Sequence, residues 1–270
     1  MVCLACGTRP AGTDSGRCFG CAEAAPGWAA ALNPANGLAT AVSVLLGLNA
    51  AMAAVLVTID VWSNVLTGRL LDGADDVGAE DFAPLKAVAN ALNGVLPPVA
   101  LATVVVFIIW FHRTRKNADL LAPNGHRMGR GWTIGAWFTP IAQLWIPWQL
   151  MADCWRASAP LDPEGRRRPP SEAVLAVWWS TFVGSLVLGR VAATMTRHVG
   201  QMDSIDLENL RTGVWVEAGG AALRLVAAIA AILVVRRLTS MQRTRRADIN
   251  LIAARAAQEA RVKAVVSPTG

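Results

Sequence analysis

Long stretches of the chain carry no charged residue. Asp, Glu, Lys and Arg are absent from residues 24–59, 87–111 and 131–152, and two further apolar runs cover Ala173–Thr196 and Val214–Val235. A helix that crosses a bilayer needs about 20 predominantly apolar residues. The pattern therefore predicts membrane helices at Gly37–Ile59, at Val88–Phe111 and over the last two runs, within a transmembrane domain of residues 37–240.

The composition agrees with this assignment. Hydrophobic residues make up 54% of the 270 residues and charged residues 16%, whereas soluble domains carry about 25% charged residues. The first apolar run begins near Gly37, too far into the chain for a cleavable signal peptide, and no basic stretch directly precedes it. We expect it to remain as a membrane helix that ends near Asp60 and Trp62, with a loop following through Phe82.

Charged residues are distributed unevenly between the apolar runs. Most lysines and arginines fall in residues 112–130, 156–171 and 236–263, whereas segments 60–87 and 197–217 are predominantly acidic. Cytoplasmic loops of membrane proteins carry an excess of Lys and Arg. We therefore expect a multi-pass plasma-membrane protein with both termini in the cytoplasm and both acidic segments outside. Inside the second run, Pro97 and Pro98 should kink the helix or mark the start of its regular part.

The uncharged run Gly131–Ala152 has two interpretations. Basic segments flank it on both sides, which favours a re-entrant or in-plane segment on the cytoplasmic side; the alternative is a fifth span. Pro140 or Pro147 should break a helix here. Trp prefers the membrane interface, and at 100° per residue four of the tryptophans would form one stripe. These four are Trp137, Trp145, Trp148 and Trp155.

The predicted fold class is therefore an all-α membrane protein. It contains four transmembrane helices plus a broken or interfacial segment rich in Trp and Pro, or a fifth span in its place. A small cysteine module precedes the membrane domain, and a basic tail at residues 241–270, helical to about Val266, follows it.

Four cysteines near the N-terminus have the spacing of metal ligands. Cys3 and Cys6 form one Cys-x-x-Cys pair, and Cys18 and Cys21 form another. Four thiolates suit a tetrahedral Zn²⁺ ion, and so short a segment cannot bury a core without metal. We predict a structural zinc ribbon at residues 1–23 and a linker at 24–36. Free or redox-active thiols, or iron in place of zinc, are the alternatives.

Some charged residues inside or beside the apolar runs are candidate functional positions, because charges at membrane depth are costly. They are Asp60, Asp153, Arg190 and Arg224. We expect Asp60 and Glu217 at helix ends and both arginines within reach of the outer headgroups. Structural ion pairing therefore competes with a transport pathway.

Asp153 directly follows the Trp-rich segment. We expect it to pair with Arg156 or with a basic residue of the neighbouring loop; a ligand or proton role is the alternative. That loop, residues 124–131, is rich in glycine and could hold a lipid headgroup or another phosphate, or it could simply set the topology. The candidate headgroup contacts are Arg113, Arg115, Lys116, Arg127 and Arg130.

Two blocks resemble known families. Residues 3–8, Cys-Leu-Ala-Cys-Gly-Thr, with Cys-Phe-Gly-Cys at 18–21, resemble the zinc ribbon that precedes many actinobacterial membrane proteins. Trp137-Phe-Thr-Pro, Trp145-Ile-Pro and Asp153-Cys-Trp-Arg-Ala-Ser resemble the block of an uncharacterised family, the domain of unknown function 4328. Arg113, Asn117, Trp178, Trp179 and Arg190 also fit, over about residues 40–240. The resemblance implies membrane topology and the ribbon, and no substrate.

No catalytic set stands out, and we do not expect an enzyme. The leading hypothesis is a membrane-anchored scaffold or sensor that binds cytosolic partners or anionic lipids through its ribbon and basic segments. It is compatible with a homo-oligomer, and we expect no nucleic-acid partner. The alternatives are a small transporter or channel that uses segment 131–155 and Arg190, and a lipid-modifying enzyme that uses Asp153 and the basic loop.

Overall fold

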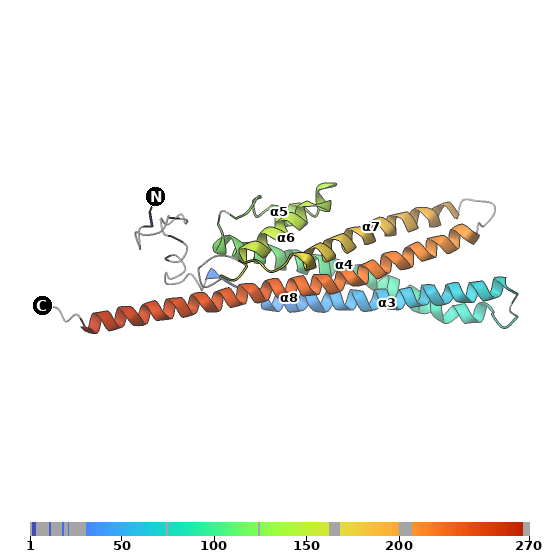
Figure 1. The fold of residues 1–270 in the computed structure, drawn as a ribbon. Coiled ribbons are helices and arrows are strands. Elements are labelled where there is room, and N and C mark those ends of the chain that lie inside the picture. Colours follow the sequence, from blue (N-terminus) through green and yellow to red (C-terminus); the bar gives the residue numbers. More distant parts are fainter. Residues whose placement is uncertain are drawn as a thin grey trace. The chain divides into compact units, whose positions relative to one another are not determined.

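The computed structural model describes a chain of helices. The described residues are 2–3, 11, 18, 21, 31–73, 75–123, 125–161, 168–199 and 207–266. The α-helices, labelled in Figure 1, are α3 (Asn36–Leu71), α4 (Ala79–Leu121), α5 (Trp132–Gly135), α6 (Ile146–Ala157), α7 (Ala173–Val199) and α8 (Leu207–Val266), and the 3₁₀ turn η1 (Ala142–Leu144) lies between α5 and α6. Every such element in the described ranges is helical, so the predicted all-α class is confirmed.

The chain divides into two compact units that alternate along the sequence. Unit 1 contains Met1–Asn36, Trp110–Pro170 and Arg237–Gly270, and unit 2 contains Gly37–Ile109 and Ser171–Arg236. Helices α4 and α8 each run from one unit into the other without a break. Unit 2 therefore collects the predicted membrane helices, whereas unit 1 collects the segments that the charge pattern predicts to be cytoplasmic.

Four helices are long and apolar enough to cross a membrane. They are α3, α4, α7 and α8, and at most 39% of the apolar stretch in any of them is buried inside the protein. Large apolar side chains such as Val44, Leu101 and Ile229 are exposed on them. Because such surfaces need an apolar surround, the protein is a membrane protein with the four spans that the sequence predicts.

The helices extend beyond the apolar runs. α3 continues to Leu71 and α4 begins at Ala79, so the predicted loop from Asp60 through Phe82 is wrong. Asp60 lies inside α3 and Glu217 inside α8, which corrects the expectation that both sit at helix ends. The reason is that turn residues end helices: Gly73 just beyond α3 has a φ of 81°, a conformation that favours glycine.

A side-chain hydrogen bond and a close approach of two helices hold unit 2 together. The Asn49 side-chain amide on α3 donates to the Thr103 hydroxyl on α4, at 2.8 Å. On α8, a Cβ at Gly220 would lie 3.3 Å from the Leu188 Cβ and 3.8 Å from the Ser185 carbonyl of α7. Small residues allow membrane helices to approach this closely. α4 continues through Pro97 and Pro98, so these prolines do not start its regular part.

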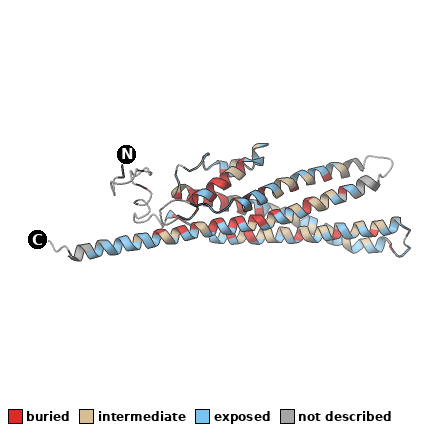
Figure 2. Ribbon diagram, viewed as in Figure 1, coloured by how far each residue is buried: buried red, intermediate tan, exposed pale blue. Residues whose placement is uncertain are grey.

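Unit 1 has a core of large side chains. Trp110 and Phe111 on α4, Leu150 and Trp155 on α6, and Leu238 on α8 are almost fully buried. Figure 2 shows α6 mostly in the buried colour and α8 over residues 251–259 mostly in the exposed one. α8 ends at Val266, as the sequence predicts for the tail.

The segment between α4 and α6 is broken. After α5 the chain turns, and Ile141 has φ 66° and ψ −55° while the Ala142 amide donates to the Pro140 carbonyl at 2.7 Å. These are the features of a γ-turn, rare for a β-branched residue and strained by about 1–3 kcal/mol. A second break at Trp145 precedes α6, which has Pro147 in its first turn. The predicted break at the prolines is confirmed, and the segment supplies none of the four candidate spans.

The predicted Trp stripe is wrong. Trp155 is fully buried, whereas Trp145 is 47% exposed. The stripe requires one continuous helix from Trp137 to Trp155, and the γ-turn and η1 interrupt the helical phase between them. Periodicity along a sequence places side chains on one face only while the helix is unbroken.

Candidate functional site

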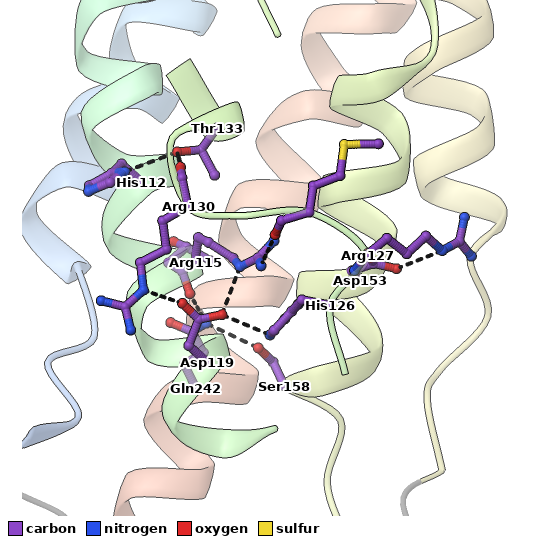
Figure 3. Close-up of polar contacts among 12 residues, drawn as sticks. His112, Arg115, Asp119, His126, Arg127, Arg130, Thr133, Asp153, Ser158 and Gln242 are labelled. Carbon is purple, nitrogen blue, oxygen red and sulfur yellow. Dashed lines mark hydrogen bonds and ion pairs between the residues drawn. The ribbon is translucent and has the colours of Figure 1, made fainter. Parts of the chain in front are cut away.

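Two carboxylates, Asp119, which is partly buried, and Asp153, which is buried, organise the basic loop of unit 1. Asp119 lies in the last turn of α4, and Arg115, one turn earlier, donates from its Nε to Asp119 Oδ1 at 2.9 Å. Arg130, at the end of the loop, donates from its Nε to Asp119 Oδ2. His126, in the middle of the loop, brings its Nε2 to 3.3 Å from Asp119 Oδ1. Figure 3 shows these side chains converging on Asp119.

Asp153 on α6 is the second carboxylate. The Arg127 backbone N–H donates to Asp153 Oδ2 at 3.2 Å, and the Arg127 Nε lies 3.6 Å from Asp153 Oδ1. Arg156 Nη1 lies 3.8 Å from the same oxygen. Both pairings that the sequence suggests for Asp153 are therefore present. Asp153 is almost fully buried while both arginines are exposed, so the carboxylate holds two basic side chains at the surface.

Further hydrogen bonds close the loop against α4. Arg115 Nη2 donates to the Met128 carbonyl at 2.6 Å. The Thr133 hydroxyl donates to the Arg130 carbonyl at 2.7 Å and lies 3.0 Å from His112 Nδ1. Because the Thr133 proton is already used, His112 must carry its proton on Nδ1. Hydrogen bonds to Met128 and Arg130 thus fix the loop of residues 122–131 at more than one position.

A pair of side-chain amides joins four segments of unit 1. Asn117 on α4 donates from Nδ2 to the Asn33 carbonyl at 3.0 Å and to Gln242 Oε1 at 2.8 Å. Gln242 on α8 donates to the Thr114 carbonyl at 2.9 Å and to the Ser158 hydroxyl at 3.0 Å. All four amide protons have acceptors, as buried polar groups require. We call this set the amide hub; its role is to fix the unit's packing.

Burial changes the acid–base chemistry of two side chains here. Burial lowers the pKa of His126 below its ordinary value, and the Arg115 guanidinium lowers it further, against the opposing effects of the Ala118 backbone, Asp119 and Asp153. Burial raises the pKa of the Cys154 thiol to about 12. A thiol that stays protonated at neutral pH is a poor nucleophile, so Cys154 behaves as a small buried apolar side chain.

The segment that follows the loop exposes its apolar side chains. They are Trp132, Ile134, Phe138, Ile141, Leu144 and Trp145, with Phe138 71% and Ile141 68% exposed. We call this set the apolar edge. Arg127 and Arg130 beside it in sequence are exposed as well. The exposed apolar side chains therefore follow in sequence two exposed arginines, each paired with a carboxylate.

The scan against protein families gives one match. Residues 72–240 match the model described as a domain of unknown function, DUF4328. The chain belongs to this family. The match begins after α3, later than the resemblance suggests, and it contains the basic loop, the apolar edge and Asp153. No curated protein and no solved structure matches the chain.

Three of the four predicted metal ligands lie together. The sulfurs of Cys3, Cys18 and Cys21 all lie within 4.8 Å of one another. Cys6 lies outside the described residues. Three neighbouring thiols can hold a metal ion, and their chemistry suits zinc. The N-terminal module lies outside the DUF4328 match.

The other predicted residues separate between the units. Arg113 and Lys116 are exposed on α4 in unit 1. Asp60, Arg190 and Arg224 belong to unit 2, where Arg224 Nη2 lies 3.4 Å from Glu217 Oε1. None of these three belongs to the cluster around the loop.

Sequence reasoning missed several residues of the site. Asp119 is one of them, although it stands four residues after Arg115, the spacing of a helical ion pair. Gln242 and Asn117 carry no such signal, because their partners are distant in sequence. His126, which lies against Asp119, carries no local signal either, since a lone histidine in a loop does not identify its partner.

Proposed function

We propose that this protein is a membrane-anchored scaffold that binds anionic lipids on the cytoplasmic face of the plasma membrane. Unit 2 provides the anchor, and unit 1 rests on the membrane surface through the apolar edge. The observation that carries the proposal is the exposure of six large apolar side chains beside exposed arginines. In this proposal the apolar edge inserts at the membrane interface and the arginines recognise the negative charge of the lipid headgroups.

The apolar edge suits a membrane interface. Trp and Phe concentrate at the boundary between headgroups and acyl chains, and segments with exposed apolar side chains and flanking Arg lie in that plane. In water, an apolar surface of this kind favours aggregation. The γ-turn at Ile141 supports the same role, because it keeps Ile141 and nearby Phe138 exposed at some conformational cost.

The exposed basic residues suit an anionic surface. Arg127 is paired with Asp153 and Arg130 with Asp119, and both arginine side chains remain more than half exposed. Arg113 and Lys116 add two exposed charges on α4. Each basic residue near an anionic leaflet contributes about 1 kcal/mol of attraction. Anchoring by Asp119 and Asp153 lowers the entropy lost when an arginine binds a phosphate.

The same proposal places both termini in the cytoplasm. The basic segments of unit 1 favour that side, and thiolate metal ligands persist in a reducing compartment. There the cysteine module would hold Zn²⁺ and, with the exposed end of α8, bind cytosolic protein partners. The metal can be tested by mass spectrometry of the intact protein, where Cys18→Ser should lose the zinc that Cys154→Ser retains.

Photo-crosslinking in nanodiscs tests the lipid contact. Phosphatidylglycerol and phosphatidylcholine, each with a diazirine in its acyl chain, are supplied separately, and labelled peptides are mapped. Both lipids should label residues 132–145, with phosphatidylglycerol labelling them more. Replacing Arg127 and Arg130 by Gln should reduce this preference. If α3 and α7 are labelled and the apolar edge is not labelled by either lipid, the proposal is wrong.

A further inference from the structure

Helices α7 and α8 have a fixed register in unit 2. A Cβ at Gly220 would lie 3.3 Å from the Leu188 Cβ and 3.7 Å from the Gly189 backbone nitrogen, and a Cβ at Gly184 would lie 3.1 Å from Leu223. Contacts between backbones allow little sliding, because any larger side chain would clash. The positions of the arginines near this contact are therefore set by the helices themselves.

Arg224 extends from α8 onto the surface of α7. Its Nη1 lies 3.7 Å from the position that a Cβ on Gly189 would occupy, so a larger side chain there would crowd the guanidinium. Its contact with Glu217 is long, 3.4 Å, and both side chains are nearly half exposed. Asp60 on α3 also interacts electrostatically with Glu217 and Arg224. The carboxylates nearby offset the charge of Arg224 without enclosing it.

Arg190 is the residue next to Gly189, so its Cα lies about 3.8 Å from that of the glycine beneath Arg224. It is exposed and belongs to the apolar stretch of α7. Within the described residues it makes no hydrogen bond or ion pair. An arginine at membrane depth costs about 2.5–3.5 kcal/mol when nothing compensates its charge. An anion outside the chain is the simplest compensation.

We propose that Arg190 and Arg224 bind the phosphate group of a membrane phospholipid against the small surface at Gly189. A phosphate accepts paired hydrogen bonds from guanidinium groups, and the Arg224 guanidinium lies against Gly189, the residue before Arg190. Arg190 lies nine residues before the end of α7, about 14 Å along the helix, a depth that a long side chain and a headgroup can share. This site is independent of the lipid contact of unit 1.

Native mass spectrometry of the full-length protein from nanodiscs tests the site. The probes are phosphatidylglycerol, phosphatidylcholine and inorganic phosphate, added separately. The variants are Arg190→Gln, Arg224→Gln and Arg190→Lys, with Arg69→Gln as a control, because Arg69 is an exposed arginine of the same unit that pairs with Asp76. Monodispersity on size exclusion and the helical circular dichroism signal verify that each variant folds.

The wild type should retain a phospholipid, and Arg190→Gln should lower this retention about tenfold, the loss of one charge-assisted hydrogen-bonding group. Arg190→Lys should fall between the two, because lysine keeps the charge and loses the paired donors. Arg69→Gln should retain lipid as the wild type does. The proposal would be overturned if Arg190→Gln retained as much phospholipid as the wild type, or if Arg69→Gln lost as much as Arg190→Gln. It would also be overturned if the protein bound inorganic phosphate instead of lipid, or if Arg190 proved necessary for a dimer.

Discussion

The two units of the protein bury polar groups in opposite ways. In unit 2 the buried hydroxyls of Ser43, Thr103 and Ser185 each donate to a carbonyl of their own helix. In unit 1 the amide hub and Asp153 bond to segments far away in sequence, and Asp119 joins the end of α4 to the basic loop. Because unit 2 has an apolar surround, it assembles through helix contacts and small residues, whereas unit 1 depends on specific polar partners.

This difference matters for stability and for function. In unit 2 a Ser or Thr hydroxyl that donates to a carbonyl of its own helix is satisfied without linking two segments of the chain. Each polar bond in unit 1 commits a particular residue to a particular partner, and losing it leaves a buried group without one. Unit 1 should therefore be the more sensitive to substitution, and it is the unit that carries the basic loop and the apolar edge.

The largest effect should come from the core of unit 1. Trp155 is fully buried, and its indole N–H donates to the Pro170 carbonyl at 3.0 Å. Trp155→Ala should lower the free energy of unfolding by about 3–5 kcal/mol. Trp62→Ala on α3 should change it by about 0.5 kcal/mol or less, because Trp62 is 56% exposed. Denaturation in detergent followed by circular dichroism measures both, and equal losses would remove the contrast between the units.

The next effect concerns ion pairs. Asp119→Ala leaves Arg115, which is almost fully buried, without its carboxylate and should lower the free energy of unfolding by about 3 kcal/mol. The matched change in unit 2 is Asp76→Ala, which breaks an exposed pair with Arg69 and should cost about 1 kcal/mol at most. The same unfolding assay applies. A cost for Asp76→Ala as large as that for Asp119→Ala would contradict the comparison.

A smaller effect compares two side-chain amides. Gln242→Leu removes the centre of the amide hub, so one Asn117 amide proton loses its acceptor and the Thr114 carbonyl loses the Gln242 donor, which should cost about 2 kcal/mol. Asn49→Leu removes the bond between α3 and α4 in unit 2. Interhelical bonds in membranes average about 0.6 kcal/mol, so this change should cost less. Unfolding in detergent measures the loss of unfolding free energy in both variants. A larger loss for Asn49→Leu than for Gln242→Leu would show that unit 2 depends more on its buried hydrogen bonds than unit 1 does.

Sequence predicts the two units unequally well. The four spans follow from apolar runs such as Val88–Phe111, because the hydrophobic effect acts on composition alone. The break at Pro140 follows because proline cannot donate a backbone hydrogen bond. The apolar runs do not predict where the helices end. The first run ends at Ile59, for example, whereas α3 continues to Leu71. The amide hub could not be predicted, because Asn117 and Gln242 lie far apart in sequence and nothing local identifies the pair.

The smallest effect should be a dependence on pH that originates in unit 1. Burial and Arg115 lower the pKa of His126 in the folded protein, opposed in part by Asp119, Asp153 and the Ala118 backbone, while the unfolded chain retains a histidine pKa near 6.5. Below about pH 6.5 the unfolded state therefore binds a proton that the folded state resists. The stabilisation is complete above that pH and is lost as the pH falls toward the folded-state value.

His126→Gln should therefore flatten the change in unfolding midpoint between pH 7.5 and pH 5.5. His112→Gln is the matched control for the substitution itself, since it removes a histidine of the same unit whose contact is with Thr133. Hydrogen exchange of residues 125–131 at both pH values shows where the change occurs, and it should increase at low pH in the wild type only, since protonation weakens the packing of His126 against Arg115. If the wild type and His126→Gln respond equally to acid, the sensitivity belongs to another group, and the loop is held by its arginines alone.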